Sequence, residues 1–133
     1  MIVTGGNSGI GLETAVSLAT LGANVVITAR HPERGDGAVS AIRRRTGSER
    51  VGVLPLDLAS FDSIRPFTRM FLDRYERLDV LVNNAGLAPD SRRWETTDGF
   101  EAAFGVNHLG HFLLTRLLLE RLIAGHPGDA PSG

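Results

Sequence analysis

Short apolar runs alternate with longer amphipathic segments along the chain. Such runs are typical of strands buried on both faces of a sheet, and the longer segments have helical spacing. The predicted strands are Ile2–Thr4, Asn24–Ala29, Val51–Leu56 and Asp79–Val82. The predicted helices are Gly9–Leu21, Glu33–Thr46, Ser60–Tyr75 and a long region, Asp98–Ala124, with a break near Gly105 or Gly110. The predicted loops are Leu87–Thr97 and a Pro-containing tail, Gly125–Gly133.

The alternation of strands and helices predicts an α/β fold with a doubly wound parallel sheet, of which this chain holds about four strands. Right-handed crossovers place the second and third strands on one side of the first strand and the fourth on the other. Ligands bind outside the carboxyl ends of the strands at such a reversal of strand order. We therefore expect one domain, residues 1–124, with a binding crevice between the loops that follow the first and fourth strands.

A glycine-rich turn joins the first strand to the first helix. Gly5 can adopt the positive φ of a sharp turn, while Gly9 and Gly11 leave backbone N–H groups at the helix start open to phosphate. Because a strand precedes the turn and a helix follows it, we interpret it as a dinucleotide site rather than a glycine-rich turn without a ligand. The candidate cofactor-binding residues here are Thr4, Gly5, Asn7, Ser8, Gly9, Ile10 and Gly11.

A second loop, Asn83-Asn84-Ala85-Gly86, follows the fourth strand. The amide of Asn83 or Asn84 can donate and accept, which suits it to tie strand ends together or to hold a ribose hydroxyl. An Asn-Asn loop without a ligand role is the alternative. Because this loop is expected beside the glycine turn, we predict that Asn83, Ala85 and Gly86 belong to the cofactor site.

The end of the second strand indicates which dinucleotide is preferred. An acid at this place binds the ribose 2′-hydroxyl of NAD, whereas an arginine accommodates the 2′-phosphate of NADP. Here Ala29 and Arg30 stand at this place, and no carboxylate precedes Glu33. We therefore predict NADP(H) as the cofactor, with NAD as the alternative. A solvated loop arginine is the other interpretation of Arg30.

Composition narrows the function classes. A net charge of −1 over 133 residues gives no electrostatic case for nucleic acid. The most apolar stretch is too broken by charges to span a membrane. Cysteine is absent, which excludes thiolate chemistry and fits a reducing compartment, so we expect a cytoplasmic protein. His108 and His111 are three apart but lack further ligands, so no metal site is predicted.

These motifs together resemble the short-chain dehydrogenase/reductase family. The match covers the glycine turn, the loop Asn83–Gly86, Asp57 within Leu56-Asp57-Leu58, and Asn107 within a segment similar to retinol-dehydrogenase-like members. The resemblance implies a Rossmann-like fold and hydride transfer. It implies that Asp57 contacts the adenine, with Leu58 beside it in the cofactor site, and that Asn107 is one of four active-site residues. A cap on the following helix is the alternative role for Asp57.

The remaining catalytic residues of that family are missing. Its members use a tyrosine, a lysine four residues later and an upstream serine. Tyr75 is the only tyrosine here, Asp79 stands four residues later, and all 14 basic residues other than histidine are arginine. A phenol without such tuning is a poor proton-transfer group at neutral pH. We therefore expect a fragment cut at both ends, the N-terminal cofactor-binding part of a reductase.

Three functional hypotheses follow. The first is an NADP(H)-dependent short-chain oxidoreductase acting on a small-molecule carbonyl or alcohol, present as its cofactor-binding part. The second is a non-catalytic dinucleotide-binding or dimerising remnant, and the third is an incomplete product without a stable fold. The Leu-rich segment Leu109–Leu122 is apolar on more than one face, which suits either contact with a second subunit or plain core.

Overall fold

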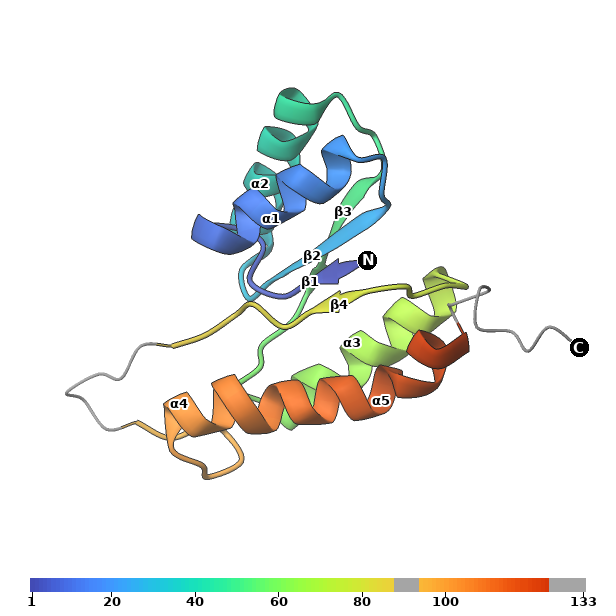
Figure 1. The fold of residues 1–133 in the computed structure, drawn as a ribbon. Helices are drawn as coiled ribbons and strands as arrows, with labels where there is room; N and C mark the ends of the chain where they lie inside the picture. Colours follow the sequence, from blue (N-terminus) through green and yellow to red (C-terminus); the bar gives the residue numbers. More distant parts are fainter. Residues whose placement is uncertain (88–93, 125–133) are drawn as a thin grey trace, which may run out of the picture.

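A computed structural model describes residues 1–87 and 94–124. Four parallel strands form one sheet in the order β3-β2-β1-β4 (Figure 1). The strands are β1 (Ile2–Val3), β2 (Val25–Ala29), β3 (Val51–Pro55) and β4 (Leu81–Val82). The predicted strand order and the reversal at β1 are confirmed, and only the strand ends differ by one or two residues.

Helices cover both faces of the sheet, as the alternation of elements predicts. On one face lie α1 (Gly9–Thr20) and α2 (Pro32–Thr46), and on the other lie α3 (Phe61–Arg74) and α5 (His111–Ala124) (Figure 1). Gly22 and Gly47 follow α1 and α2 with φ of +89° and +70°, so glycine ends these helices in the left-handed region. The chain is therefore doubly wound.

Successive strand residues point to opposite faces, which divides the core in two. Ile2, Val26 and Leu54 contribute to the larger core, on the α3 and α5 side, which also contains the fully buried Leu114 and Leu118. Val3, Ile27 and other β-branched residues pack with α1 and α2. The Leu-rich helix thus forms core through part of its surface, while Phe112 and Ile123 are 60% and 69% exposed.

The prediction of a helix from Asp98 is wrong, because helical structure begins only at α4 (Ala102–Phe104). Gly99 has φ +86°, which is outside the helical region, and Asp98 Oδ2 instead accepts the N–H of Phe61 at the start of α3. The Glu101 carboxylate accepts the N–H groups of Ala103 and Phe104, so Glu101 caps the new helix.

The predicted break near Gly105 or Gly110 is a π-helical turn, η1 (Gly105–Gly110), between α4 and α5. Both glycines permit close packing. A Cβ on Gly105 would lie 2.3 Å from Cγ2 of Thr96, and one on Gly110 would lie 2.5 Å from the carbonyl oxygen of Leu58. The turn therefore lies directly against the loop that follows β3.

The predicted tail, residues 125–133, lies outside the described residues, as does the part of the predicted loop at 88–93. Within the ranges that the structure describes, no helix has the length and apolar character that a membrane crossing requires.

Candidate functional site

A cavity of about 230 Å³ opens at the carboxyl ends of the strands. Its walls come from the glycine turn, the end of β2, the start of α2, the loop after β3, the loop after β4 and one residue of η1. Eight of the predicted cofactor-binding residues line it, namely Gly5, Asn7, Ser8, Arg30, Asp57, Leu58, Ala85 and Gly86. The motifs that lie far apart in the sequence are therefore brought to one crevice.

The start of α1 carries free hydrogen-bond donors beside this cavity. Ser8 precedes the helix but makes no side-chain cap, and within the described residues the backbone N–H groups of Gly9, Ile10 and Gly11 have no partner. Gly9 has φ +55°, and no atom lies within 4 Å of where its Cβ would be. The free amides and the helix dipole favour an anion, and the missing side chain leaves room for one.

Gly5 and Gly11 are glycines for a different reason, namely contact within the protein. Gly5 has the predicted positive φ, +65°, and a Cβ there would lie 2.9 Å from the Cα of Ala85. A Cβ on Gly11 would lie 2.3 Å from the carbonyl oxygen of Gly5 and 2.5 Å from Nδ2 of Asn84. These two glycines therefore let the first turn pack tightly against the loop after β4.

Thr4 joins these two loops from below, with its side chain fully buried. Its Oγ1 accepts the N–H groups of Asn84 at 2.9 Å and Ala85 at 3.0 Å. The same Oγ1 lies 2.9 Å from Nε2 of His111, while Asn84 Nδ2 donates to the Thr4 carbonyl oxygen at 3.3 Å. Two roles were considered for the paired asparagines, and Asn84 has the first of them, which is to tie the strand ends together.

The outer rim of the cavity is basic. Arg30, His31 and Arg34 line it at the end of β2 and the start of α2, and Asp57 is the one carboxylate among the described residues of the lining. Both arginines are exposed, and neither makes an ion pair with a residue in the described ranges. A dianionic group at this rim would meet guanidinium donors that carboxylates of the described residues leave open.

Asp57 faces the cavity and does not cap α3. Its Oδ1 accepts the N–H of Ala59 at 2.9 Å, and its own N–H donates to the hydroxyl of Ser63 at 2.8 Å. The cap on α3 comes from Asp98 instead, since Ser60 makes no side-chain bond there. The capping alternative for Asp57 is therefore wrong, and its place in the wall is compatible with the adenine contact.

Asn83 and Asn107 do not line the cavity. Asn83 Nδ2 donates to the hydroxyl of Thr115 on α5 at 3.2 Å. The Asn107 side chain bonds the backbone of Leu87 in both directions, at 2.8 Å for the Leu87 N–H and 3.0 Å for its carbonyl. In this structure Asn107 thus holds the end of the loop after β4, while the catalytic role implied by resemblance stays a prediction.

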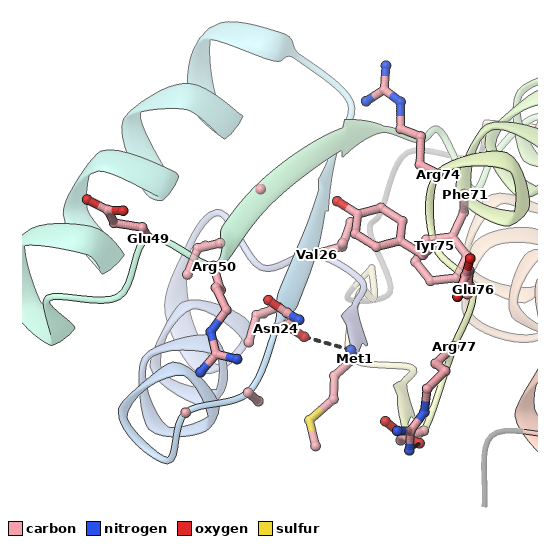
Figure 2. Close-up of a pocket in the computed structure, with 16 residues that line it drawn as sticks. Met1, Asn24, Val26, Glu49, Arg50, Phe71, Arg74, Tyr75, Glu76 and Arg77 are labelled. Carbon is pink, nitrogen blue, oxygen red and sulfur yellow. Dashed lines mark hydrogen bonds and ion pairs between the residues drawn. The ribbon is translucent and has the colours of Figure 1, made fainter.

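A larger cavity, about 650 Å³, lies at the amino ends of the strands, on the opposite side from the crevice (Figure 2). Tyr75 lines it, and its ring stacks on Phe71 with centroids 4.8 Å apart. The Met1 amino group donates to the carbonyl of Asn24 at 2.7 Å in the same region (Figure 2). The predicted glycine turn has no residue in this cavity, so the smaller crevice is the candidate site, and Tyr75 is a core-edge residue as predicted.

Several lining residues were missed from sequence. They are Thr28, His31, Arg34, Leu56, Ala59, Leu87 and Val106. Arg34 stands in the first turn of α2, which begins at Pro32 directly after the end of β2, and this place could have indicated a second cation near Arg30. Thr28 Oγ1 accepts the N–H of Gly5 at 3.2 Å, and no local sequence pattern predicts this contact between the ends of two strands. No group of three or more His, Asp or Glu side chains in the described ranges could hold a metal ion.

A family model described as short chain dehydrogenase matches residues 1–130. This chain belongs to that family. The short-chain dehydrogenase relatives include human retinol dehydrogenase 13, 49% identical over 127 residues, which cover 96% of this chain and 38% of the relative. Mouse polyprenol dehydrogenase is 53% identical over 123 residues, covering 92% of this chain and 36% of the relative.

Solved structures agree with the family and the fold. A metagenomic short-chain oxidoreductase in complex with NADP superposes with a TM-score of 0.79 and 34% identity, over 92% of this chain and 56% of that one. The short-chain dehydrogenase chain described here therefore spans under two fifths of the two curated relatives and just over half of this structure.

Proposed function

We propose that this chain is the NADP(H)-binding part of a short-chain oxidoreductase that transfers hydride between the nicotinamide and a carbonyl or alcohol. The observation that carries the proposal is the start of α1. Three backbone N–H groups without a described partner and a glycine with an open Cβ position face an anion site beside the crevice. A pyrophosphate fits these donors without any charged side chain.

The residues of the crevice suggest how the dinucleotide is oriented. Asp57, with one carboxylate oxygen bonded to Ala59, would meet the adenine in the wall formed after β3. Arg30 and Arg34 would bind the 2′-phosphate at the rim, which supports NADP(H) over NAD(H). Gly86 and Leu87 also line the crevice, and we propose that the nicotinamide end would lie beside them.

A bound nicotinamide would supply the hydride itself. The chain's own contribution would be to bind the cofactor, orient it along the crevice and hold the loop after β4 against the glycine turn. No lysine is present, and Tyr75 lies at the amino ends of the strands, away from the crevice. We therefore propose that proton transfer belongs to residues that are not among these 133.

The substrate class stays at the level of a carbonyl or alcohol. The retinol and polyprenol dehydrogenases are named for different alcohols, yet both are about as similar to this chain. Sequence identity over these residues therefore indicates a shared cofactor-binding part and does not distinguish between the two alcohols. We propose a small-molecule carbonyl or alcohol of unspecified structure.

The test is calorimetric titration of the purified 133-residue chain with NADPH and with NADH. We expect saturable one-to-one binding of both and a lower Kd for NADPH. Absence of heat up to millimolar NADPH, from a chain that shows a cooperative thermal transition, would refute the proposal. A lower Kd for NADH would refute only the cofactor preference.

A non-catalytic dinucleotide-binding or dimerising module is the second candidate, and the missing lysine is the observation that favours it. It uses the same crevice and the same α1 donors. Exposed Phe112 and Ile123 on α5 would supply the apolar contact for a dimer. An assay of NADPH oxidation with a panel of aldehydes separates the two, because this candidate predicts binding with no turnover in any assembly that contains the chain.

A further inference from the structure

His111 is a buried, titratable side chain that the proposed function does not use. It is 6% exposed, and it lies at the junction of η1 and α5, beneath the crevice. Its Nε2 is 2.9 Å from Thr4 Oγ1, and its Nδ1 is 3.4 Å from the carbonyl oxygen of Asn107. His111 thus touches both residues that hold the loop after β4, since Thr4 holds its start and Asn107 holds Leu87.

The hydrogen-bond network around Thr4 determines the tautomer of His111. A hydroxyl oxygen has two lone pairs, and those of Thr4 accept the N–H groups of Asn84 and Ala85. The Thr4 hydroxyl hydrogen must then be donated, either to Nε2 at 2.9 Å or to the Val82 carbonyl at 3.4 Å. The shorter contact assigns the donation to Nε2, so Nε2 carries no hydrogen and Nδ1–H faces Asn107.

Protonation of His111 would conflict with this arrangement. A hydrogen on Nε2 would point at an oxygen whose lone pairs are already filled, and the Thr4 hydroxyl would have to turn toward Val82. Either the Ala85 N–H would then lose its acceptor, or the Asn84 N–H would keep only its second acceptor, the Val82 carbonyl at 3.0 Å. Because Gly5 lies against the Cα of Ala85, a shift of this loop would also displace the glycine turn.

Among the described residues, no carboxylate faces His111, so a charged imidazolium would meet only backbone carbonyls and neutral groups. The β1 end presents the hydroxyl of Thr4 and the β4 loop presents amides of Asn84 and Ala85. On α5 and η1, the carbonyls of Asn107 and Val106 face it, while Arg116, Glu120 and His108 are exposed. The charged residues of α3, which packs against α5, are also exposed; they are Asp62, Arg65, Arg69, Asp73 and Arg74.

We propose that His111, in its neutral Nδ1–H form, is the positioning residue that keeps the loop after β4 in its cofactor-binding arrangement, and that protonation of His111 releases this loop. The inference rests on the proposed function, because the loop forms one wall of the crevice. His111 lies four residues after Asn107 in the same segment, but neither the resemblance nor the proposed function gives it a role.

Burial lowers the pKa of His111 below its ordinary value of 6.5, and hydrogen bonds to the Asn107 and Val106 carbonyls partly offset this. The unfolded chain binds a proton first as the pH falls, so the contribution of neutral His111 to stability is complete above 6.5. That contribution is lost as the pH falls from 6.5 through the lowered pKa of the folded state.

The first experiment is NMR of the unaltered 133-residue chain, following the His111 ring nitrogens and the amides of Asn84 and Ala85 from about pH 8 to about pH 5. We expect the Nδ1–H tautomer at high pH and a shared midpoint for the ring and both amides. An Nε2–H tautomer, or amides that do not move as the ring titrates, would overturn the inference. This measurement needs neither cofactor nor a variant.

The second experiment compares NADPH binding to two variants. His111→Gln keeps an amide near the position of Nε2 without a titrating group, and His108→Gln removes an exposed histidine of the same helical region, between Phe104 and Phe112. We expect acidification to weaken binding to the unaltered chain and to His108→Gln about fivefold more than to His111→Gln, which corresponds to about 1 kcal/mol, the net value of one hydrogen bond.

The outcomes separate the two proposals. If all three chains lose affinity equally on acidification, His111 is not the positioning residue, even though the crevice binds NADPH. If no chain binds NADPH while the amides of Asn84 and Ala85 still titrate with His111, the proposed function fails and the control of the loop by His111 stands.

Discussion

Asn107 pairs with the backbone of Leu87 in both directions, accepting its N–H at 2.8 Å and donating to its carbonyl at 3.0 Å. Such pairing replaces a strand ladder where β4 has already ended. The π-helical turn η1 brings the Asn107 side chain to this position, opposite the loop after β4. A residue implied by resemblance to be catalytic therefore also has a structural role in forming the wall of the crevice.

We therefore expect Asn107→Ala to lower the free energy of unfolding by about 1 kcal/mol, because two partly solvated hydrogen bonds are lost. Urea denaturation measures this. Asn83→Ala is the control, since Asn83 is exposed and makes one longer bond, 3.2 Å, to Thr115. An Asn107→Ala chain as stable as the Asn83→Ala chain would show that the pairing with Leu87 does not stabilise the fold.

Gly9 and Gly47 form a matched pair for testing the anion site. Both have positive φ, +55° and +70°, and neither has an atom within 4 Å of its Cβ position. Alanine at either should cost about 1 kcal/mol from left-handed backbone strain. Only Gly9→Ala places a methyl group where a phosphate would approach, so we expect about tenfold weaker NADPH binding in that variant alone.

Thermal denaturation and NADPH titration of both variants decide this prediction. Equal losses of stability with unequal losses of affinity are the expected result. If Gly9→Ala binds NADPH as tightly as Gly47→Ala, the start of α1 does not contact the cofactor, and the observation that carries the proposed function is removed.

The sheet order was predictable because each strand is a continuous apolar run and each crossover must be right-handed. The positive φ of the glycines at 5, 22 and 47 was equally predictable, since each of them follows a strand or a helix. The start of the last helical region was not predictable from periodicity. It depends on Asp98, which bonds the N–H of Phe61 across the loop instead of joining its own helix.

The site divides in the same way. Residues within contiguous motifs, such as Gly5 and Ala85, were predicted and do meet at one crevice. Contacts between side chains far apart in sequence were not predicted. The clearest example is His111, whose partner Thr4 is 107 residues away, and no spacing rule links two such positions before the fold is known.

Arg30 is predicted to determine the choice between NADPH and NADH. It lies at the rim of the crevice with His31 and Arg34, and it makes no ion pair within the described part of the chain. Arg30→Asp removes a charge-assisted hydrogen bond and places a carboxylate against the 2′-phosphate. We expect NADPH affinity to fall about tenfold to a hundredfold, while NADH affinity changes little.

Arg44→Asp is the control for this prediction. Arg44 is also exposed, but it lies near the end of α2, away from the crevice, so its substitution changes the net charge equally. Titration of both variants with both cofactors gives the ratio of Kd values. An unchanged ratio in Arg30→Asp would assign the preference to another residue, and a shift in Arg44→Asp would indicate a long-range charge effect.

Gly110 and Gly37 test how closely η1 must approach the loop after β3. A Cβ on Gly110 would lie 2.5 Å from the carbonyl oxygen of Leu58, whereas no atom lies within 4 Å of the Cβ position of Gly37 in α2. Gly110→Ala should therefore destabilise the chain by about 1–3 kcal/mol through overpacking, and Gly37→Ala should stabilise it by about 0.5–1 kcal/mol through helix propensity. Because Leu58 lines the crevice, Gly110→Ala should also weaken NADPH binding. Urea denaturation should give changes of opposite sign in the free energy of unfolding for the two variants. If Gly110→Ala is as stable as Gly37→Ala, η1 can move away from Leu58 without cost, and Gly110 does not position the wall of the site.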